Sequence, residues 1–114
     1  KEKEYYENLI QLVKGQKIFQ NTELSLRDLA TKLDIHPNYL SQIINKNEKK
    51  TFYDFINVYR VAEFKKRISD PKNQQFTLMS VAYDCGFNSK SSFNRYFKKI
   101  TNQTPTQYLK SIKS

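Results

Sequence analysis

The side chains between residues 90 and 98 are mostly polar or basic, and they recur three and four positions apart. This is the spacing of one face of an α-helix. Arginine and lysine can hydrogen-bond guanine or a phosphate, asparagine can bind adenine, and serine can bind either base. The residues in this pattern are Lys90, Ser91, Asn94, Arg95 and Lys98. They could therefore contact the base edges or the backbone of a nucleic acid.

Few residues could support a different chemistry. The chain has one cysteine, Cys85, and one histidine, His36. This composition excludes a disulfide framework, a zinc site with His and Cys ligands, and a Cys-His or Ser-His-acid catalytic set within the chain. Two glycines, far apart, exclude a P-loop and a dinucleotide fingerprint. We expect no catalytic residue, no metal and no cofactor, with Cys85 in the core and His36 in a turn.

Basic residues are concentrated in the second half of the chain. The 114 residues hold 20 Lys+Arg and 11 Asp+Glu, a net charge of +9. Residues 58–114 hold 11 Lys+Arg and 3 Asp+Glu, so nearly all the excess lies there. Such a field favours a polyanionic partner, either nucleic acid or an anionic membrane surface. The basic segments are short and interrupted by turns, unlike a membrane-surface helix.

Helices must position these side chains, because helical periodicity dominates and no period-two strand appears. We expect an all-α fold of about seven helices, with N-caps at Ser25, Thr51, Thr77 and Ser89. The expected helices cover residues 3–15, 26–33, 37–44, 51–69, 78–85, 90–100 and 105–112. In this prediction Gly15 supplies a left-handed stop, residues 45–50 form a polar turn, and Ala62 faces inward with Phe52, Phe55, Ile56, Tyr59 and Ile68.

Two segments of the chain match each other. Residues 40–46 align with residues 93–99 at a shift of 53, and the apolar positions agree throughout. Upstream, Leu29 and Ala30 align with Val81 and Ala82 at a shift of 52. A short helix with an alanine at the crossing, a tight turn and a second helix indicate a helix-turn-helix. The expected division is residues 1–50 and 71–114 as two subdomains, joined by a linker helix at 51–70.

The repeat predicts two recognition helices with different character. The outward face of the first carries no cation before Lys46, so we expect it to contact bases through uncharged side chains: Asn38, Ser41, Gln42 and Asn45. The second presents Lys90, Ser91, Asn94 and Arg95 to bases. The residues expected to contact the DNA backbone are Ser25, Lys46, Thr77, Lys98 and Lys99.

The second repeat also carries a family resemblance. Residues 81–99, with Thr104, Pro105 and Tyr108, resemble the signature of the AraC/XylS family of bacterial transcription regulators, and the likeness extends over about 105 of the 114 residues. It departs at Asn102, where the family usually has glycine. It also departs at His36 and Pro37, where small capping residues are common. Asparagine tolerates the left-handed conformation, so we expect the same turn at Asn102.

The resemblance implies a sequence-specific double-stranded DNA-binding domain with two helix-turn-helix subdomains tied by a long helix. Both recognition helices would enter successive major-groove segments on one face of the DNA. It also implies RNA polymerase as a partner and a sensor or dimerisation region upstream of Lys1, without which we expect this piece to be monomeric. We expect the domain in the cytoplasm, and a membrane link elsewhere in the full protein stays open.

Several alternatives remain open at this level. A polar helix face can simply be solvated, and Arg95 can pair with a carboxylate such as that of Asp84. Lys65, Lys66 and Arg67 can clamp a DNA backbone or form a solvated helix end. The whole chain can be an adaptor that binds another protein, or a general binder of RNA or single strands.

Overall fold

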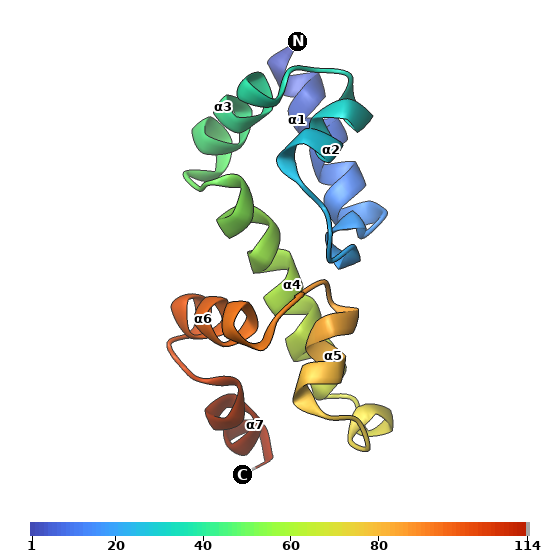
Figure 1. The fold of residues 1–114 in the computed structure, drawn as a ribbon. Coiled ribbons are helices and arrows are strands. Elements are labelled where there is room, and N and C mark those ends of the chain that lie inside the picture. Colours follow the sequence, from blue (N-terminus) through green and yellow to red (C-terminus); the bar gives the residue numbers. More distant parts are fainter. Residues whose placement is uncertain (114) are drawn as a thin grey trace.

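The computed structural model describes residues 1–113, which form seven α-helices, three short turns of other helix types and no strand (Figure 1). The all-α prediction is confirmed. The α-helices are α1 (Glu2–Ile10), α2 (Leu26–Leu33), α3 (Pro37–Glu48), α4 (Phe52–Ile68), α5 (Leu78–Asp84), α6 (Lys90–Thr101) and α7 (Pro105–Lys113). The short turns are η1 (Gln11–Gly15), η2 (Ile18–Gln20) and η3 (Pro71–Asn73).

Hydroxyl caps at the four predicted positions fix the starts of α2, α4, α5 and α6. At α2, the Ser25 hydroxyl accepts a hydrogen bond from the Asp28 amide at 3.0 Å. Equivalent bonds from the third helical residue reach the cap hydroxyls of α4, α5 and α6 at 3.3, 3.0 and 3.1 Å. Each bond satisfies an amide that has no partner within its own helix. The predicted caps at Ser25, Thr51, Thr77 and Ser89 are confirmed.

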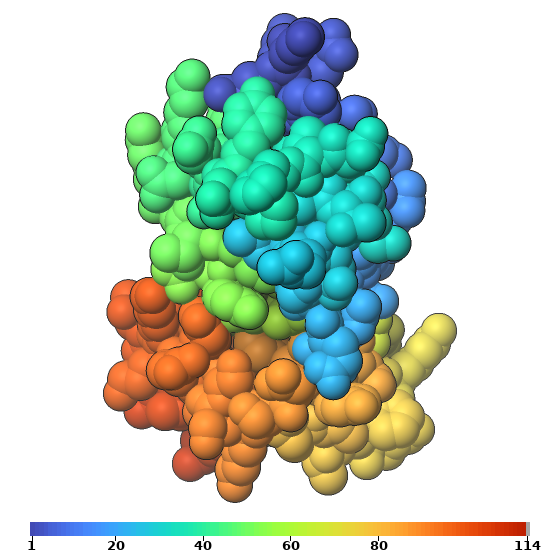
Figure 2. All heavy atoms as spheres, turned by 45° about the horizontal axis from the view of Figure 1, so that its top comes forward, coloured from blue at the N-terminus to red at the C-terminus, as the bar shows by residue number. Residues whose placement is uncertain are grey.

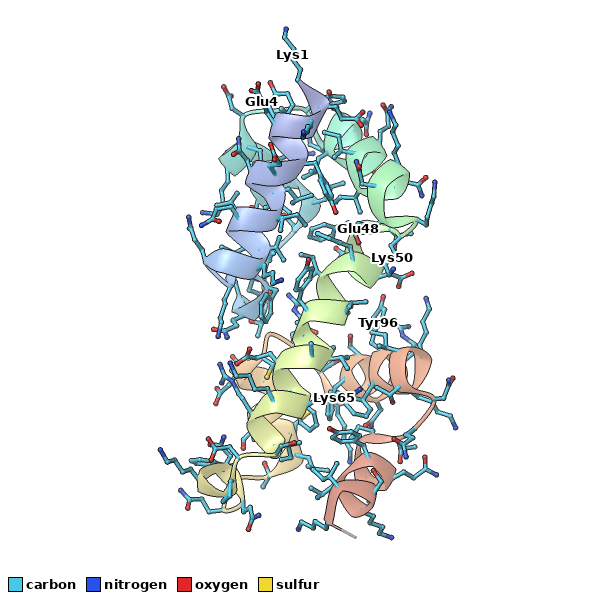
Figure 3. The ribbon with its side chains drawn as sticks, turned by 180° about the vertical axis from the view of Figure 1, so that it is seen from behind. Lys1, Glu4, Glu48, Lys50, Lys65 and Tyr96 are labelled. Carbon is cyan, nitrogen blue, oxygen red and sulfur yellow. The ribbon has the colours of Figure 1, made fainter. Side chains whose placement is uncertain are left out.

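Helix α4 is shared by two hydrophobic cores. Its first half contributes Phe52, Phe55 and Ile56 to a core with residues of α1, α2 and α3, which we call the first core. Its second half contributes Val61, Phe64 and Ile68 to the second core, with residues of α5, α6 and the turn between them. In Figure 3, Glu48 and Lys50 mark the end of α4 nearer the first core, and Lys65 marks the half beside the second. One helix therefore holds both halves of the molecule.

The prediction that Ala62 faces inward is wrong, because Ala62 is exposed. Continuing the first stripe of Phe52, Phe55 and Tyr59 would bury Ala62. The second stripe instead runs through Val61, Phe64 and Ile68. Since each residue turns an α-helix by about 100°, the two stripes lie on different sides of α4. The two cores pack against α4 from different directions.

Two predicted helix ends also need correction. Gly15 has no left-handed backbone; η1 is a π-turn in which the Gln16 amide bonds the Gln11 carbonyl, and Lys17 takes the left-handed conformation at φ 54°. The turn predicted at 45–50 is shorter, because α3 continues to Glu48 and turns left-handed at Lys49. The Asn47 side-chain amide donates a hydrogen bond to the Ile43 carbonyl, one helical turn back, at 2.8 Å.

The molecule is elongated, with extents of 47 × 24 × 22 Å. Helices α1, α2 and α3 gather at one end of α4, and α5, α6 and α7 at the other (Figure 1). Helices α3 and α6 lie toward the same side of the molecule in both the front and back views (Figures 1 and 3). The fold thus presents both helices of the repeat on one side.

Candidate nucleic-acid interface

Helix α3 begins at an unusual cap and presents a polar face. The His36 ring nitrogen Nδ1 accepts a hydrogen bond from the Asn38 amide at 3.1 Å, and Pro37 occupies the first helical position. Histidine thus replaces the small capping residue expected there. The buried side of α3 consists of Leu40, Ile43 and Ile44. The opposite side exposes all four predicted base-contacting residues, Asn38, Ser41, Gln42 and Asn45.

Helix α1 braces α3 against the first core. The Tyr5 and Tyr39 rings meet edge to face with centroids 5.8 Å apart. The Tyr6 hydroxyl donates a hydrogen bond to the Glu48 carboxylate at the end of α3. This bond, together with burial, raises the pKa of Tyr6 to about 12. The polar face of α3 is therefore held by contacts at both ends of the helix.

Helix α6 has the same design with a more basic face. Phe93 and Phe97 are buried, and the exposed side carries Lys90, Ser91, Asn94, Arg95, Lys98 and Lys99. The Phe64 ring of α4 lies 4.9 Å from Phe93 and 5.5 Å from Phe97, between ring centroids. This aromatic cluster fixes the rotation of α6 about its axis and so determines which side chains point outward.

The turns between the paired helices match in the two copies. Ala30 and Ala82 are buried where the helices cross, as the repeat predicts. The Ile35 amide bonds the Ala30 carbonyl, and the Phe87 amide bonds the Ala82 carbonyl, both at 3.1 Å. Asp34 and Gly86 have positive φ, 58° and 115°. The two helix-turn-helix units therefore share their local geometry.

The predicted backbone-contacting residues differ in what they already contact. Ser25 and Thr77 use their hydroxyls as caps of the first helix of each unit. Lys46 lies 3.3 Å from a Glu2 carboxylate oxygen. Lys99 bonds both carboxylate oxygens of Asp54 at 3.1 Å, which ties α6 to α4. Among residues 1–113, Lys98 is exposed and has no such carboxylate partner.

Arg95 lies beside a cleft between the two cores. Its guanidinium is 5.0 Å from the centroid of the Tyr96 ring, and it makes no ion pair with Asp84 in the described chain. Figure 2 shows the face on which the segment before α2, the start of α4 and helix α6 meet. The cleft measures about 340 Å³ and is lined by Thr22, Glu23, Leu24, Ser25, Tyr53, Asn57, Arg60, Asn88, Ser92, Arg95 and Tyr96.

Sequence reasoning missed the α4 residues of this cleft. Tyr53 is 55% exposed and lies outside the apolar stripe formed by the buried Phe52 and Phe55. A large aromatic residue outside that stripe is the signal that could have identified it from the sequence. Asn57 and Arg60 are buried and polar. Their burial depends on how the two units pack together, which helical periodicity does not encode.

The basic run at the end of α4 has partly structural contacts. Arg67 pairs with Glu63 at 2.9 Å, and the Lys65 ammonium lies 5.4 Å from the centroid of the Tyr108 ring. Glu63 is also 3.6 Å from Lys17. Burial alone would raise the pKa of Glu63, but the Arg67 bond and the Lys17 charge lower it overall. Lys66 remains exposed.

Other chemistry finds little support in the described residues. No group of three His, Cys, Asp or Glu side chains among residues 1–113 is arranged to hold a metal ion. Burial raises the pKa of the Cys85 thiol to about 12, so the thiol stays protonated at neutral pH. None of the helices within this range is long and apolar enough to cross a membrane.

Comparison with known proteins places this geometry in a family. A family described as "Helix-turn-helix domain" matches residues 29–111, a segment that contains both α3 and α6. The chain belongs to the AraC-type helix-turn-helix family. It is an AraC-type DNA-binding effector domain, which confirms the resemblance seen in residues 81–108.

Related sequences come from bacterial regulators. The AraC-type domain is 30% identical over 91 residues to the HTH-type transcriptional regulator YijO of Escherichia coli, covering 80% of this chain and 31% of that protein. It is 24% identical over 110 residues to the transcriptional regulatory protein HptR of Staphylococcus aureus, covering 96% and 41%. The chain thus spans about a third to two fifths of the length of these two relatives.

Solved structures share the fold. A Listeria innocua protein of unknown function superposes with a TM-score of 0.80 at 30% identity, covering 92% of this AraC-type domain and 94% of that chain. The C-terminal domain of the response regulator AraT from Geobacillus stearothermophilus gives a TM-score of 0.80 at 23% identity, covering 94% and 84%. The expected arrangement of two helix-turn-helix units on a long helix is confirmed.

Proposed function

We propose that this domain binds double-stranded DNA sequence-specifically, with α3 and α6 in successive major-groove segments. The observation that carries the proposal is the pair of matching helices whose inner faces belong to two cores joined by α4 and whose outer faces are polar and exposed. The residues assigned to base contacts are Asn38, Ser41, Gln42, Asn45, Lys90, Ser91, Asn94 and Arg95. The division into subdomains 1–50 and 71–114 with a linker at 51–70 belongs to this proposal.

The assignment rests on side-chain chemistry as well as exposure. Amides and hydroxyls on α3 can discriminate bases without adding charge, whereas the cations of α6 add attraction to phosphate. Backbone contacts are assigned to Ser25, Lys46, Thr77, Lys98 and Lys99. The net charge of +8 in residues 58–114 supports a stronger electrostatic anchor in the second unit.

We also propose a wider role, which the family and the relatives support. We assign the domain no catalytic activity and no cofactor, and we place it in the bacterial cytoplasm. Its partners besides DNA would be RNA polymerase and a sensor or dimerisation region outside residues 1–114. The greater length of YijO and HptR leaves room for such a region.

Selection from a pool of random duplexes tests the proposal. We expect two enriched blocks of base pairs about one helical turn, roughly 34 Å, apart. Affinity for a selected duplex should also fall log-linearly with salt concentration. A protein that enriched no sequence, or that bound single strands as well as duplexes, would contradict the proposal. Binding to another protein without any salt-dependent duplex binding would favour the adaptor role instead.

A further inference from the structure

Arg60 lies at the middle of α4, between the first and second cores, and is 7% exposed. Its guanidinium donates three hydrogen bonds. Nε bonds the Phe19 carbonyl at 2.7 Å, Nη2 bonds the Asn21 carbonyl at 3.0 Å, and Nη1 bonds the Asn57 side-chain oxygen at 3.1 Å. Of the first two acceptors, Phe19 lies in η2 and belongs to the first core, and Asn21 is the residue directly after η2. The Arg60 side chain of α4 therefore binds two backbone carbonyls of the first unit, those of Phe19 and Asn21.

The same point contacts the second unit. Gly86, in the turn of the second helix-turn-helix, lies so close that a Cβ on it would be 2.1 Å from the Phe19 carbonyl oxygen and 2.5 Å from Arg60 Nε. No side chain fits in that space. The positive φ of Gly86 adds a second reason for glycine there. The η2 segment, α4 and the second turn thus converge on Arg60.

Stability alone does not explain an arginine at this position. Burial lowers the pKa of Arg60 to about 10, and none of its bonds within residues 1–113 goes to a carboxylate. Burying the guanidinium costs desolvation free energy, and its three hydrogen bonds to uncharged oxygens offset part of that cost. The planar guanidinium group has several hydrogen-bond donors at fixed angles, which an apolar side chain lacks.

We propose that Arg60 is a positioning residue that locks the two helix-turn-helix units in one relative orientation and thereby fixes the spacing of the two DNA blocks. The proposal rests on the proposed function for its DNA readout. Inserting one base pair between the blocks moves them apart by about 3.4 Å and rotates one against the other by about 34°. A locked protein cannot follow this change, whereas a loosened one can.

Affinity for duplexes with altered spacing tests the lock. The selected site is compared with versions lengthened or shortened by one base pair, for wild type, Arg60→Met and Arg60→Lys. We expect wild type to lose about tenfold or more on the altered sites, as for a mismatched site, and Arg60→Met to lose under about threefold. Arg60→Lys, with one ammonium in place of the fork, should fall between them. Val61→Ala, a neighbouring buried truncation, controls for general destabilisation and should keep the wild-type profile.

A second measurement needs no DNA. Spin labels at Lys32→Cys and Lys98→Cys report the distance between the units, and buried Cys85 stays unlabelled. We expect a narrow distance distribution with Arg60 and a broad one with Arg60→Lys. This measurement decides the proposal if Arg60→Met does not fold. Wild type without sequence preference would sink the proposed function but leave the distance test valid. Unchanged spacing profiles, or an unchanged distance distribution, would overturn the lock.

Discussion

Gln42 and Arg95 occupy the same outward position in the two units, and both are exposed. The Arg95 guanidinium lies over the Tyr96 ring near the cleft edge, whereas Gln42 makes no such ring contact within residues 1–113. Substituting each of the two residues therefore tests whether equivalent positions in the two units make equivalent contacts to DNA bases.

We predict that Gln42→Ala relaxes base preference in one DNA block and Arg95→Ala in the other. Each lost contact should remove about 1–3 kcal/mol of discrimination, at adenine for Gln42 and at guanine for Arg95. Binding to a panel of single-base variants of the selected site measures this. Gln74→Ala, an exposed change in the loop before α5, is the matched control. An even loss over every sequence would show that the two residues contact phosphate.

Lys98 and Lys99 are adjacent but differ in their surroundings, since Lys99 is engaged by Asp54. We predict that Lys98→Ala weakens binding to specific and non-specific duplexes alike and makes the salt slope shallower by about 0.9.

We also predict that Asp54→Asn tightens binding to any duplex by about two- to fivefold, the contribution of one surface ion pair, because it frees Lys99. Affinities over a salt series check both. A sequence-selective loss in Lys98→Ala would mean that this lysine contacts bases.

Tyr6 gives the molecule a measurable pH dependence. Its bond to Glu48 raises the folded-state pKa to about 12 from 10.0, so the stability it contributes is complete below pH 10 and lost as pH rises through 12. We predict that Tyr6→Phe lowers the free energy of unfolding by about 1 kcal/mol at neutral pH. The gap from wild type should shrink between pH 10 and 12. Denaturant unfolding at several pH values measures it, with Tyr5→Phe as control. A gap independent of pH would refute the role of this bond.

At the scale of elements, the aromatic cluster on α4 sets the orientation of α6. Phe64 is fully buried and contacts both inward phenylalanines of α6. We predict that Phe64→Ala costs about 3–5 kcal/mol of stability. Thermal unfolding gives the size of the effect, and amide exchange should locate it in α5, α6 and α7. Ala62→Ser, an exposed change two residues away, should shift stability by under about 0.5 kcal/mol. Equal loosening of α1, α2 and α3 would contradict the two-core arrangement.

Local signals predicted the elements well. The caps at Ser25, Thr51, Thr77 and Ser89 were predictable because a hydroxyl before an apolar stripe has a specific bond to make. Asn102 adopts φ 63°, the left-handed turn expected where the family has glycine. The end of α3 was not predictable, because the Tyr6 bond to Glu48 joins residues 42 positions apart. The helix stop predicted at Gly15 was wrong, because the chain forms a π-turn there and becomes left-handed only at Lys17.

The candidate site was predictable only where it lies within one helix. The outward faces of α3 and α6 follow from the apolar stripes opposite them, and every residue predicted on those faces is exposed. The cleft residues Tyr53, Asn57 and Arg60 depend on where one unit lies against the other. That placement depends on the two apolar stripes of α4, which lie on different sides of the helix. We expected one continuous stripe from the sequence and therefore did not predict this placement.

At the scale of the whole molecule, charge and surface favour a single copy in solution. The exposed large apolar residues are dispersed over α4, α5, α7 and the loop before α5, and the net charge is +9. Like charges oppose self-association, and dispersed apolar residues form no large contact area. We predict that residues 1–114 alone sediment as a monomer and bind duplexes weakly. A tight dimer in sedimentation would contradict this.

The two offset stripes of α4 constrain how the chain can change in length over evolution. One residue inserted between Ile56 and Val61 would rotate everything beyond it by about 100° and shift it by about 1.5 Å. Such an insertion would pull Gly86 away from Phe19 and turn α6 away from the side occupied by α3. The loop at residues 70–77 lies outside both cores, so it can lengthen without moving α3 or α6. Viable descendants of this gene should therefore gain and lose codons in that loop, while the interior of α4 keeps its length.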